Sequence, residues 1–388
     1  MGIHKESRGK HMSDHRRGRA LRYAALIATL ALTAAACGSD DDGASDTTAG
    51  TDAPAASEAP AATDAPADTE AATATEAPAE SDAPAATDAA TGTDAGEPAG
   101  EPEKADIKLG IIPIADVAPV FIGIEQGFFE EEGLTVSTEF AQGGAASIPS
   151  VVSGDIDFAF GAYPSFFSAV QEGLPLLIST EANRAAPLFG GLYALPDSGI
   201  ATPADLAGKT IAVNTLNNLV QLAVEAQLVD AGLTLDDVTL VEIPFPDMVA
   251  ALERGDVDVI AVVEPFGTIA KNSLDAVLVT DMFAGRIEGF PVAGFYVTES
   301  FAADNPNTVA AFNRAWAKSV DYANNTEDAV PLILPKYIET TTVEAARLLN
   351  YPLFVSGIDT DVIQTVPDFM VEAGLLDAPI DVTEHVVE

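Results

Sequence analysis

From Ile107 onward, short apolar runs alternate with segments of helical periodicity, and this alternation leaves few folds open to the chain. Apolar strands separated by helices favour βαβ units, whose strands pair in parallel. The first such stretch predicts strands at 107–112, 134–140 and 156–160, and helices at 117–129 and 147–153. We therefore expect an α/β fold in which each sheet is mostly parallel and flanked by helices.

The same order of elements recurs further along the chain. The second stretch predicts strands at 209–214, 238–243 and 257–263, and helices at 216–231 and 247–254. Two junctions match in sequence: VVSGDID at 151–157 with LERGDVD at 252–258, and EGLT at 132–135 with AGLT at 231–234. Glycine commonly ends a helix before a strand, so each match alone is weak. Two matches in the same order favour two similarly wound lobes.

After the second unit, the sequence predicts a strand at 290–298, a long helix at 305–325 and further helices to the end. A chain that runs through lobe 1, lobe 2 and back into lobe 1 crosses between the lobes twice. We expect lobe 1 at 105–195, lobe 2 at 196–290, and the return to lobe 1 with C-terminal helices at 291–388. We expect hinges near 192–196 and 289–294, with a cleft between the lobes.

The N-terminal segment has the pattern of an export signal. Residues 15–23 are basic, and residues 24–36 are apolar but too short to span a bilayer permanently, which predicts a signal peptide at 1–36 whether translation starts at Met1 or Met12. Small residues precede Cys37, as in a bacterial lipobox, although Ala34 stands where a larger aliphatic residue is usual. The sequence predicts that Cys37 is lipidated; the alternative is ordinary cleavage beside an incidental cysteine.

Residues 37–104 form a low-complexity segment rich in Ala, Pro, Asp and Glu. After Cys37, it holds no aromatic and no branched aliphatic residue, so it has nothing from which to build a core. Proline and like charges keep such a chain extended. We expect a disordered tether that holds the folded part at the outer face of the cell membrane.

Charge and residue usage exclude several function classes. The chain has 60 acidic and 18 basic residues, a net charge of −42, which repels nucleic acid and anionic lipid. From Cys37 onward the sole imidazole is His385 and the sole thiol is Cys37 itself. A disulfide framework, a Cys/His zinc site and a Ser-His-Asp or Cys-His catalytic group are therefore not expected. We predict no cofactor, no metal site and no enzymatic activity.

Five segments carry a resemblance to a known family. They are 111–134, 141–165, 201–228, 244–266 and 293–300, and they include the motifs IIPIADVAPVFIGIEQGFFEEEGL and PFPDMVAALERGDVDVIAVVEPF. This set resembles the substrate-binding proteins of nitrate, sulfonate and taurine importers, which are similar to the thiamine-pyrimidine synthase-like superfamily. The resemblance implies the two-lobed type II periplasmic-binding-protein fold, a monomer, and an ABC permease with its ATPase as partners.

The candidate ligand site lies at the carboxyl ends of the predicted strands, where open parallel sheets bind ligands. The residues that we expect to line one cleft are Asp116, Gly144, Tyr163, Asn214, Thr215, Asn217 and Glu264. Helix N-termini at Gly143-Gly144 and Asn214-Thr215 would suit an anionic group. Asn214 and Thr215 would donate to the ligand, and Glu264 would accept from it or stabilise the closed hinge.

Each of these residues also has a structural explanation. Asp116 and Thr215 are suited to cap helices, Gly143-Gly144 to a tight turn, Tyr163 to the core, and Glu264 to an exposed strand end. Arg184 either approaches the cleft or lies on an exposed loop. Without an arginine in the site, a bare inorganic anion is less expected, and a ligand with an amine could use Glu264 or Asp116.

The sequence thus predicts an exported, lipid-anchored receptor of an ABC importer for a ligand of the nitrate, sulfonate or taurine class. An aminopyrimidine or another thiamine- or flavin-precursor-like ligand is the first alternative, and a related enzyme of pyrimidine synthesis is the second. The effector domain of a cytoplasmic regulator can share this fold, but it would need a DNA-binding module in place of the export signal.

Overall fold

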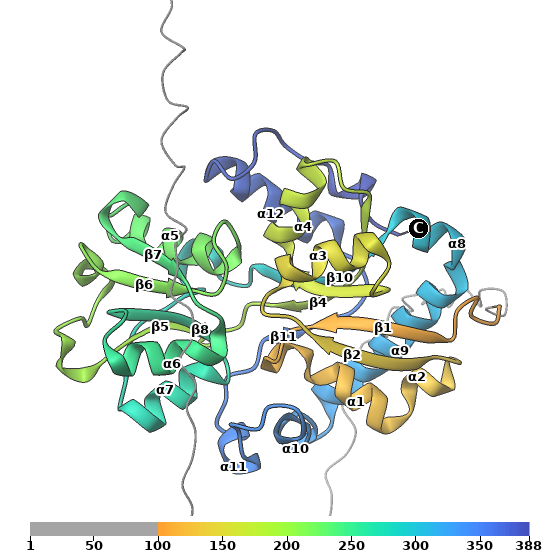
Figure 1. Ribbon diagram of the computed structural model, residues 1–388, viewed down its shortest axis with the longest axis horizontal. Coiled ribbons are helices and arrows are strands. Elements are labelled where there is room, and N and C mark those ends of the chain that lie inside the picture. The colour runs from red at the N-terminus through yellow and green to blue at the C-terminus, as the bar shows by residue number, and fades with distance from the viewer. Residues whose placement is uncertain (1–99, 388) are drawn as a thin grey trace, which may run out of the picture. The chain divides into compact units, whose positions relative to one another are not determined.

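The computed structural model describes residues 100–387. The predicted signal peptide at 1–36, the lipidation site Cys37 and most of the tether lie outside these residues, and they stay predictions. The described chain forms two lobes, each built around its own sheet, and Figure 1 shows lobe 2 on the left and lobe 1 on the right. None of the described helices is long and apolar enough to cross a membrane.

The sheet of lobe 1 has six strands in the order β11-β4-β10-β3-β1-β2. They are β1 (Asp106–Ile111), β2 (Thr135–Phe140), β3 (Phe158–Ala162), β4 (Leu176–Arg184), β10 (Pro291–Thr298) and β11 (Leu353–Phe354). β1 pairs in parallel with β2 and β3, whereas β10 runs antiparallel between β3 and β4. One half of the sheet is therefore parallel and the other antiparallel.

The sheet of lobe 2 repeats this arrangement in the order β7-β6-β8-β5-β9. Its strands are β5 (Gly190–Ala194), β6 (Thr210–Val213), β7 (Thr239–Glu242), β8 (Val259–Val263) and β9 (Val277–Asp281). β6 pairs in parallel with β7 and β8, and β5 runs antiparallel between β8 and β9. In each lobe, the strand that runs antiparallel beside the parallel set is the first strand after the chain crosses from the other lobe. It is β10 in lobe 1 and β5 in lobe 2. This confirms the predicted α/β fold with two similarly wound lobes.

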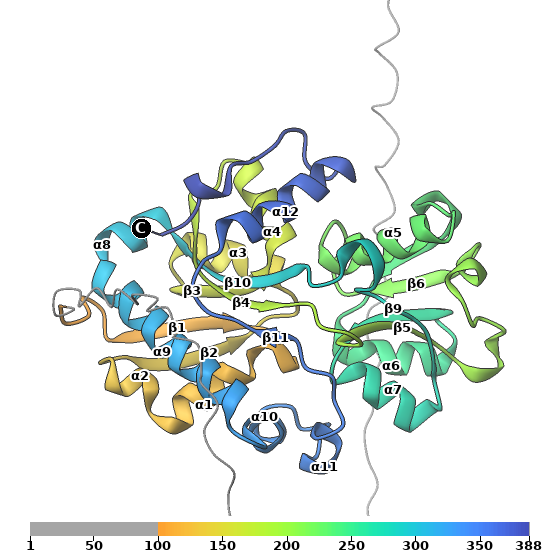
Figure 2. The same cartoon turned by 180° about the vertical axis from the view of Figure 1, so that it is seen from behind.

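Helices flank both sheets. The helices around lobe 1 are α1 (Ala118–Gln126), α2 (Phe128–Glu131), α3 (Gly144–Ser153), α4 (Tyr163–Gln171), α8 (Glu299–Asp304), α9 (Pro306–Asn325), α10 (Ala329–Ile333), α11 (Val343–Ala346) and α12 (Thr360–Glu372). Those of lobe 2 are α5 (Leu219–Asp230), α6 (Phe245–Arg254) and α7 (Phe266–Leu274). The helix predicted at 117–129 is divided at Gly127, because its left-handed φ of 77° ends α1. Figure 2 shows α9 crossing lobe 1, and α12 packs against α4.

The repeated Gly-Asp-x-Asp junction has the same structure in both lobes. The backbone N–H of Asp157 donates to the carbonyl oxygen of Lys108 at 2.9 Å, and its carboxylate accepts from the Lys108 N–H at 2.9 Å. Asp258 makes the same pair of bonds with Thr210, at 2.9 and 2.8 Å. The motif therefore fixes the start of β3 to β1 in lobe 1 and the start of β8 to β6 in lobe 2, which is a structural role.

The crossings between the lobes lie at 185–189, between β4 and β5, and at 282–290, between β9 and β10. β5 pairs with β8 and β9, so residues 190–194 belong to the sheet of lobe 2. The expected boundary after residue 195 therefore moves to before Gly190. The expected hinge at 192–196 is wrong for the same reason, because residues 192–194 are buried and hydrogen-bonded on both sides within this sheet.

The last residues of the predicted tether contact lobe 1. The Glu103 carboxylate accepts hydrogen bonds from the backbone N–H groups of Asn307 and Thr308 at 3.2 and 3.0 Å. Lys104 forms an ion pair with Asp157 at 2.7 Å. These contacts place residues 103–104 against the start of α9 and the junction before β3.

Candidate functional site

A small cavity of about 40 Å³ lies where the two lobes meet. Lobe 1 contributes Ile112, Ile114, Asp116, Phe160, Ala162, Val292 and Ala293, and lobe 2 contributes Asn214, Asn218, Leu219, Val220, Phe245 and Val263. Many of these residues end β1, β3, β6 or β8, or follow them directly. The cavity thus lies at the sheet edges where the sequence predicts a ligand site.

Three polar side chains stand among its apolar walls. Asp116, Asn214 and Asn218 are 1%, 8% and 3% exposed. Within the described part of the chain, the Oδ1 atom of each is buried and has no hydrogen-bond partner. A buried unpaired polar atom costs about 1–3 kcal/mol, so three such atoms on residues that line one cavity call for a functional explanation. An apolar pocket with a few convergent polar groups is the usual form of a small-molecule site.

Asp116 lies in a 3₁₀ turn between β1 and α1, and it does not cap α1. Its Oδ2 accepts a hydrogen bond of 2.7 Å from the side-chain amide of Asn183, at the end of β4. Burial raises the pKa of Asp116 from 3.8 to about 7, against the opposing effect of the Asn183 bond. The carboxyl group can therefore change charge near neutral pH.

Asn218, and not Asn217, is the residue of this pair that lines the cavity. Asn217 is exposed, has a left-handed φ of 53°, and donates its backbone N–H to Gln221. This turn delays the start of α5 until Leu219, three residues later than the sequence predicts, and makes Asn218 the N-cap. Asparagine at this position usually bonds to the first helical turn, but the Asn218 side chain makes no such bond.

The glycine pair at 143–144 lies at the contact between the lobes without lining the cavity. A Cβ atom on Gly143 would lie 2.8 Å from Oγ1 of Thr215 in lobe 2. A Cβ atom on Gly144 would lie 2.6 Å from Cα of Gly161 in β3. The two glycines thus allow close approach of α3 to β3 and of lobe 1 to lobe 2. Thr215 is half-buried at this contact.

Tyr163 and Glu264 are buried outside the cavity lining. Tyr163 is in the core of lobe 1, where burial raises its pKa well above the usual range. The Glu264 carboxylate accepts hydrogen bonds from the N–H and the hydroxyl of Thr268 at 2.9 and 2.8 Å, and its burial raises its pKa. The Glu264 carbonyl oxygen accepts from the N–H of Ala115 at 3.2 Å. Glu264 therefore joins the lobes beside the cavity through its backbone carbonyl, while the role of its carboxylate at the hinge or on the ligand stays a prediction.

Arg184 does not reach the cavity. It pairs with Glu181 at 2.9 Å and lies 3.6 Å from Asp359. Among the described residues that line the cavity, none is Lys, Arg or His. A ligand anion bound there would therefore meet the carboxyl group of Asp116 without a basic partner in the lining.

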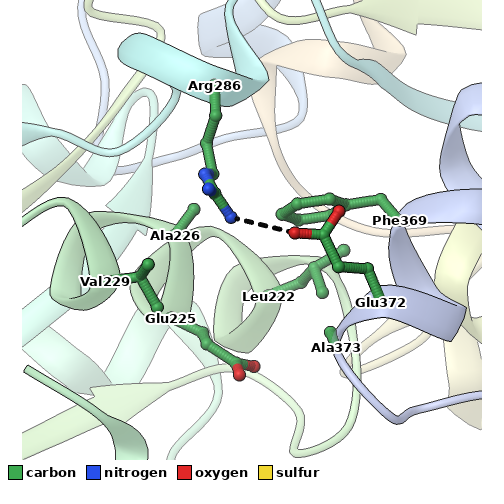
Figure 3. Close-up of a pocket in the computed structure, with 8 residues that line it drawn as sticks. All are labelled: Leu222, Glu225, Ala226, Val229, Arg286, Phe369, Glu372 and Ala373. Carbon is green, nitrogen blue, oxygen red and sulfur yellow. Dashed lines mark hydrogen bonds and ion pairs between the residues drawn. The ribbon is translucent and has the colours of Figure 1, made fainter.

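A second, outer groove of about 200 Å³ separates α5 of lobe 2 from α12 of lobe 1. Arg286 lies 3.5 Å from Glu372 of α12 (Figure 3). It also lies 3.7 Å from Asp230 of α5. Its guanidinium group also lies 5.9 Å from the ring centre of Phe369. These are exposed ion pairs, worth less than about 1 kcal/mol, so they are a weak contact between the lobes.

Comparisons with known proteins agree with this architecture. The family model described as "NMT1/THI5 like" matches residues 114–329, which span the Asp116 turn, both crossings and all of lobe 2. The riboflavin-binding protein RibY of Chloroflexus aurantiacus is 26% identical over 303 residues, 73% of this chain and 84% of that protein. The taurine-binding periplasmic protein of Escherichia coli is 30% identical over 230 residues, 58% and 67% of the respective chains.

The relatives differ in length and in chemistry. The nitrate import ATP-binding protein NrtC of a Synechocystis strain also matches, and this chain spans 39% of its length. Several of the matches are proteins of binding or import systems, but enzymes also match. An example is the 4-amino-5-hydroxymethyl-2-methylpyrimidine phosphate synthase of Aspergillus parasiticus, 25% identical over 53% of this chain and 62% of the enzyme.

Among solved structures, the alkanesulfonate-binding protein SsuA of Xanthomonas axonopodis pv. citri, bound to MOPS, superposes with a TM-score of 0.63. The match covers 73% of this chain and 98% of SsuA at 17% identity. At this identity the likeness concerns the fold alone, and it confirms the periplasmic-binding-protein fold.

Proposed function

We propose that this chain, which belongs to the NMT1/THI5-like family, is the substrate-binding component of an ABC importer and holds a small ligand between its two lobes. The relatives named for binding taurine or riboflavin and for importing nitrate support this function. The proposal includes delivery of the ligand to a membrane permease driven by an ATPase.

One observation carries the proposal: three residues, drawn from both lobes, line one cavity and each has a buried side-chain oxygen without a partner among the described residues. Asp116 comes from lobe 1, whereas Asn214 and Asn218 come from lobe 2. A ligand that bonds to both sides favours the closed arrangement, since it can make all its contacts only when the lobes are together. Ligand-driven closure is the signal that a permease needs to distinguish a loaded receptor from an empty one.

The ligand class has two candidates. The first is the nitrate, sulfonate or taurine class, supported by the taurine-binding relative and the nitrate importer. The second is a nitrogen heterocycle, supported by the riboflavin-binding relative and by the formylaminopyrimidine-binding protein of Halalkalibacterium halodurans, 24% identical over 65% of this chain.

We also propose that the protein is not an enzyme, although its relatives include a pyrimidine synthase. The cavity lining contributes one carboxyl group and two amides but no described thiol or imidazole. Incubation of the protein with a bound ligand should therefore return the ligand unchanged, and product formation would contradict this part of the proposal.

We also propose that the protein is a lipoprotein at the outer face of the cell membrane, to which the lipidated Cys37 and the tether attach its folded part. Cys37→Ser should release the protein into the medium, whereas the nearby control substitution Ser39→Ala should leave it attached. Retention of the Cys37→Ser protein on salt-washed membranes would contradict the anchor.

Binding is tested by thermal unfolding of the full chain with taurine, ethanesulfonate, nitrate, bicarbonate, riboflavin and 4-aminopyrimidine. A ligand at a hundred times its dissociation constant adds about 2.7 kcal/mol to the free energy of unfolding, a shift that is easily measured. Stabilisation by at least one compound, lost in Asn214→Ala, supports the proposal. No stabilisation by any of the six contradicts it.

A further inference from the structure

We propose that the interlobe cavity recognises its ligand through N–H groups that donate to Asp116, so that the cargo is a neutral or cationic nitrogen compound and not a bare oxyanion. This inference rests on the proposed function and specifies its substrate class. Its starting point is that the one charged side chain among the described lining residues is acidic.

The hydrogen-bond capacity of Asp116 determines what it can bind. One carboxylate oxygen already accepts from Asn183 at 2.7 Å, and the other is buried without a partner among the described residues. An ionised carboxylate accepts hydrogen bonds and cannot donate them. While Asp116 is ionised, its free oxygen therefore requires an N–H or O–H group of the ligand.

The side chains from lobe 2 are compatible with this ligand but do not select it alone. Asn214 and Asn218 each carry an amide that presents an oxygen or an NH₂ group, so they suit either donors or acceptors on the ligand. A molecule that carries N–H groups and a ring nitrogen or carbonyl oxygen could bond to Asp116 and to both amides. Nitrate has no hydrogen-bond donor, and bicarbonate has a single O–H group and no N–H group.

Electrostatics disfavour an oxyanion in this place. Arg184, the basic residue that the sequence analysis considers for the cleft, pairs with Glu181 at 2.9 Å and does not line the cavity. An anion beside the ionised Asp116 would add like-charge repulsion in a site with little solvent to screen it. A cation or a neutral donor is stabilised by the same charge.

The walls fit the organic part of such a ligand. Phe160 of lobe 1 and Phe245 of lobe 2 line the cavity together with Ile112 and Val263. Aromatic and aliphatic walls favour a ring or a hydrocarbon body over a fully hydrated ion. The volume of about 40 Å³ holds only a group of a few atoms, so a ring system requires the lobes to part further than they do here.

Matched pairs of probes test the inference in the full chain. Taurine is compared with ethanesulfonate, and 4-aminopyrimidine with pyrimidine, since each pair differs by the amino group. We expect the amino-bearing member of at least one pair to bind at least tenfold more tightly than its partner. Asp116→Asn should weaken that binding at least tenfold. Glu225→Gln is the control, because Glu225 is also a poorly solvated carboxyl group at the lobe contact but lies in the outer groove.

Each other outcome has a defined meaning. Equal binding within both pairs, or tighter binding of nitrate, bicarbonate or ethanesulfonate by Asp116→Asn than by the wild type, overturns the inference and leaves the proposed receptor function intact. Absence of binding by all of these probes contradicts the inference, and it contradicts the proposed function as well only if riboflavin also fails to bind.

Discussion

The side-chain amide of Asn183 donates a hydrogen bond to Oδ2 of Asp116 at 2.7 Å, and both residues are almost completely buried. Asn183 is the penultimate residue of β4, the last strand before the chain first crosses to lobe 2, whereas Asp116 follows the first strand. This bond holds the carboxyl group at the lobe contact and leaves Oδ1 free for a ligand. It also favours the ionised form of Asp116.

Replacing Asn183 by leucine should therefore act on binding through Asp116. We expect the affinity for an amino-bearing probe to fall several-fold, and the pH midpoint of binding to rise because the carboxylate loses a donor. Asn313→Leu is a matched control, since Asn313 is a hydrogen-bonded asparagine of α9 that lies away from the cavity. An unchanged midpoint in Asn183→Leu would contradict the positioning role.

Binding by the wild type should depend on pH near neutrality. The pKa of Asp116 is about 7, so its carboxylate is mostly ionised at pH 8 and mostly protonated at pH 6. The groups that face it are Asn183, which does not titrate, and Tyr337, whose pKa burial raises well above the usual range. Affinity for an amino-bearing probe should fall about tenfold from pH 8 to pH 6, measured by calorimetry and corrected for protonation of the probe. A rise in affinity over this interval would indicate an anionic ligand.

The same carboxyl group should limit the stability of the ligand-free protein. Its pKa is higher in the folded state than the ordinary 3.8, so the folded state binds the proton more tightly. Stability from this group is therefore complete below about pH 4 and is lost as the pH rises toward 7. Asp116→Asn should be more stable than the wild type at pH 8, by at most about 4 kcal/mol, and similar to it at pH 4. Urea unfolding at both pH values checks this, and equal stability at pH 8 would contradict it.

Close approach of the lobes should depend on Gly143. Its backbone is extended, with φ −172° and ψ 162°, so alanine is permitted there, but the added Cβ would lie 2.8 Å from Oγ1 of Thr215. Gly143→Ala should hold the lobes apart and weaken binding about tenfold, a cost typical of a small steric conflict. Adding Thr215→Ala should restore much of the affinity because it removes the conflicting oxygen. A double variant as weak as Gly143→Ala would show that the loss has another cause.

The sequence predicts local structure well where a short motif determines it. The Gly-Asp-x-Asp junctions at 154–157 and 255–258 place β3 and β8, since glycine ends the preceding helix and aspartate bonds to β1 or β6. The repeated pattern also reveals the two lobes, because each lobe needs its own alternation of strands and helices to form a core.

Cavity membership is harder to predict, because it depends on how two distant segments approach each other. Asp116 and Asn214 were found from their positions after strands, but Asn218 was missed. Because the backbone of Asn217 is left-handed, α5 starts three residues later than predicted, and Asn218 instead of Asn217 lines the cavity. Gly144 and Glu264 lie near the lobe contact but do not line the cavity. Gly144 packs against Gly161, and the carboxylate of Glu264 is hydrogen-bonded to Thr268.

The central claim, that the interlobe cavity is the ligand site, is tested most directly by Asn218→Ala beside its neighbour Asn217→Gly. Asn218 is 3% exposed and lines the cavity, whereas Asn217 is exposed outside it, and glycine keeps its left-handed backbone. Calorimetric titration should use taurine or 4-aminopyrimidine, whichever stabilises the wild type more. We predict about tenfold weaker binding for Asn218→Ala, from the loss of one buried hydrogen bond, and wild-type affinity for Asn217→Gly. Wild-type affinity in Asn218→Ala would contradict the claim.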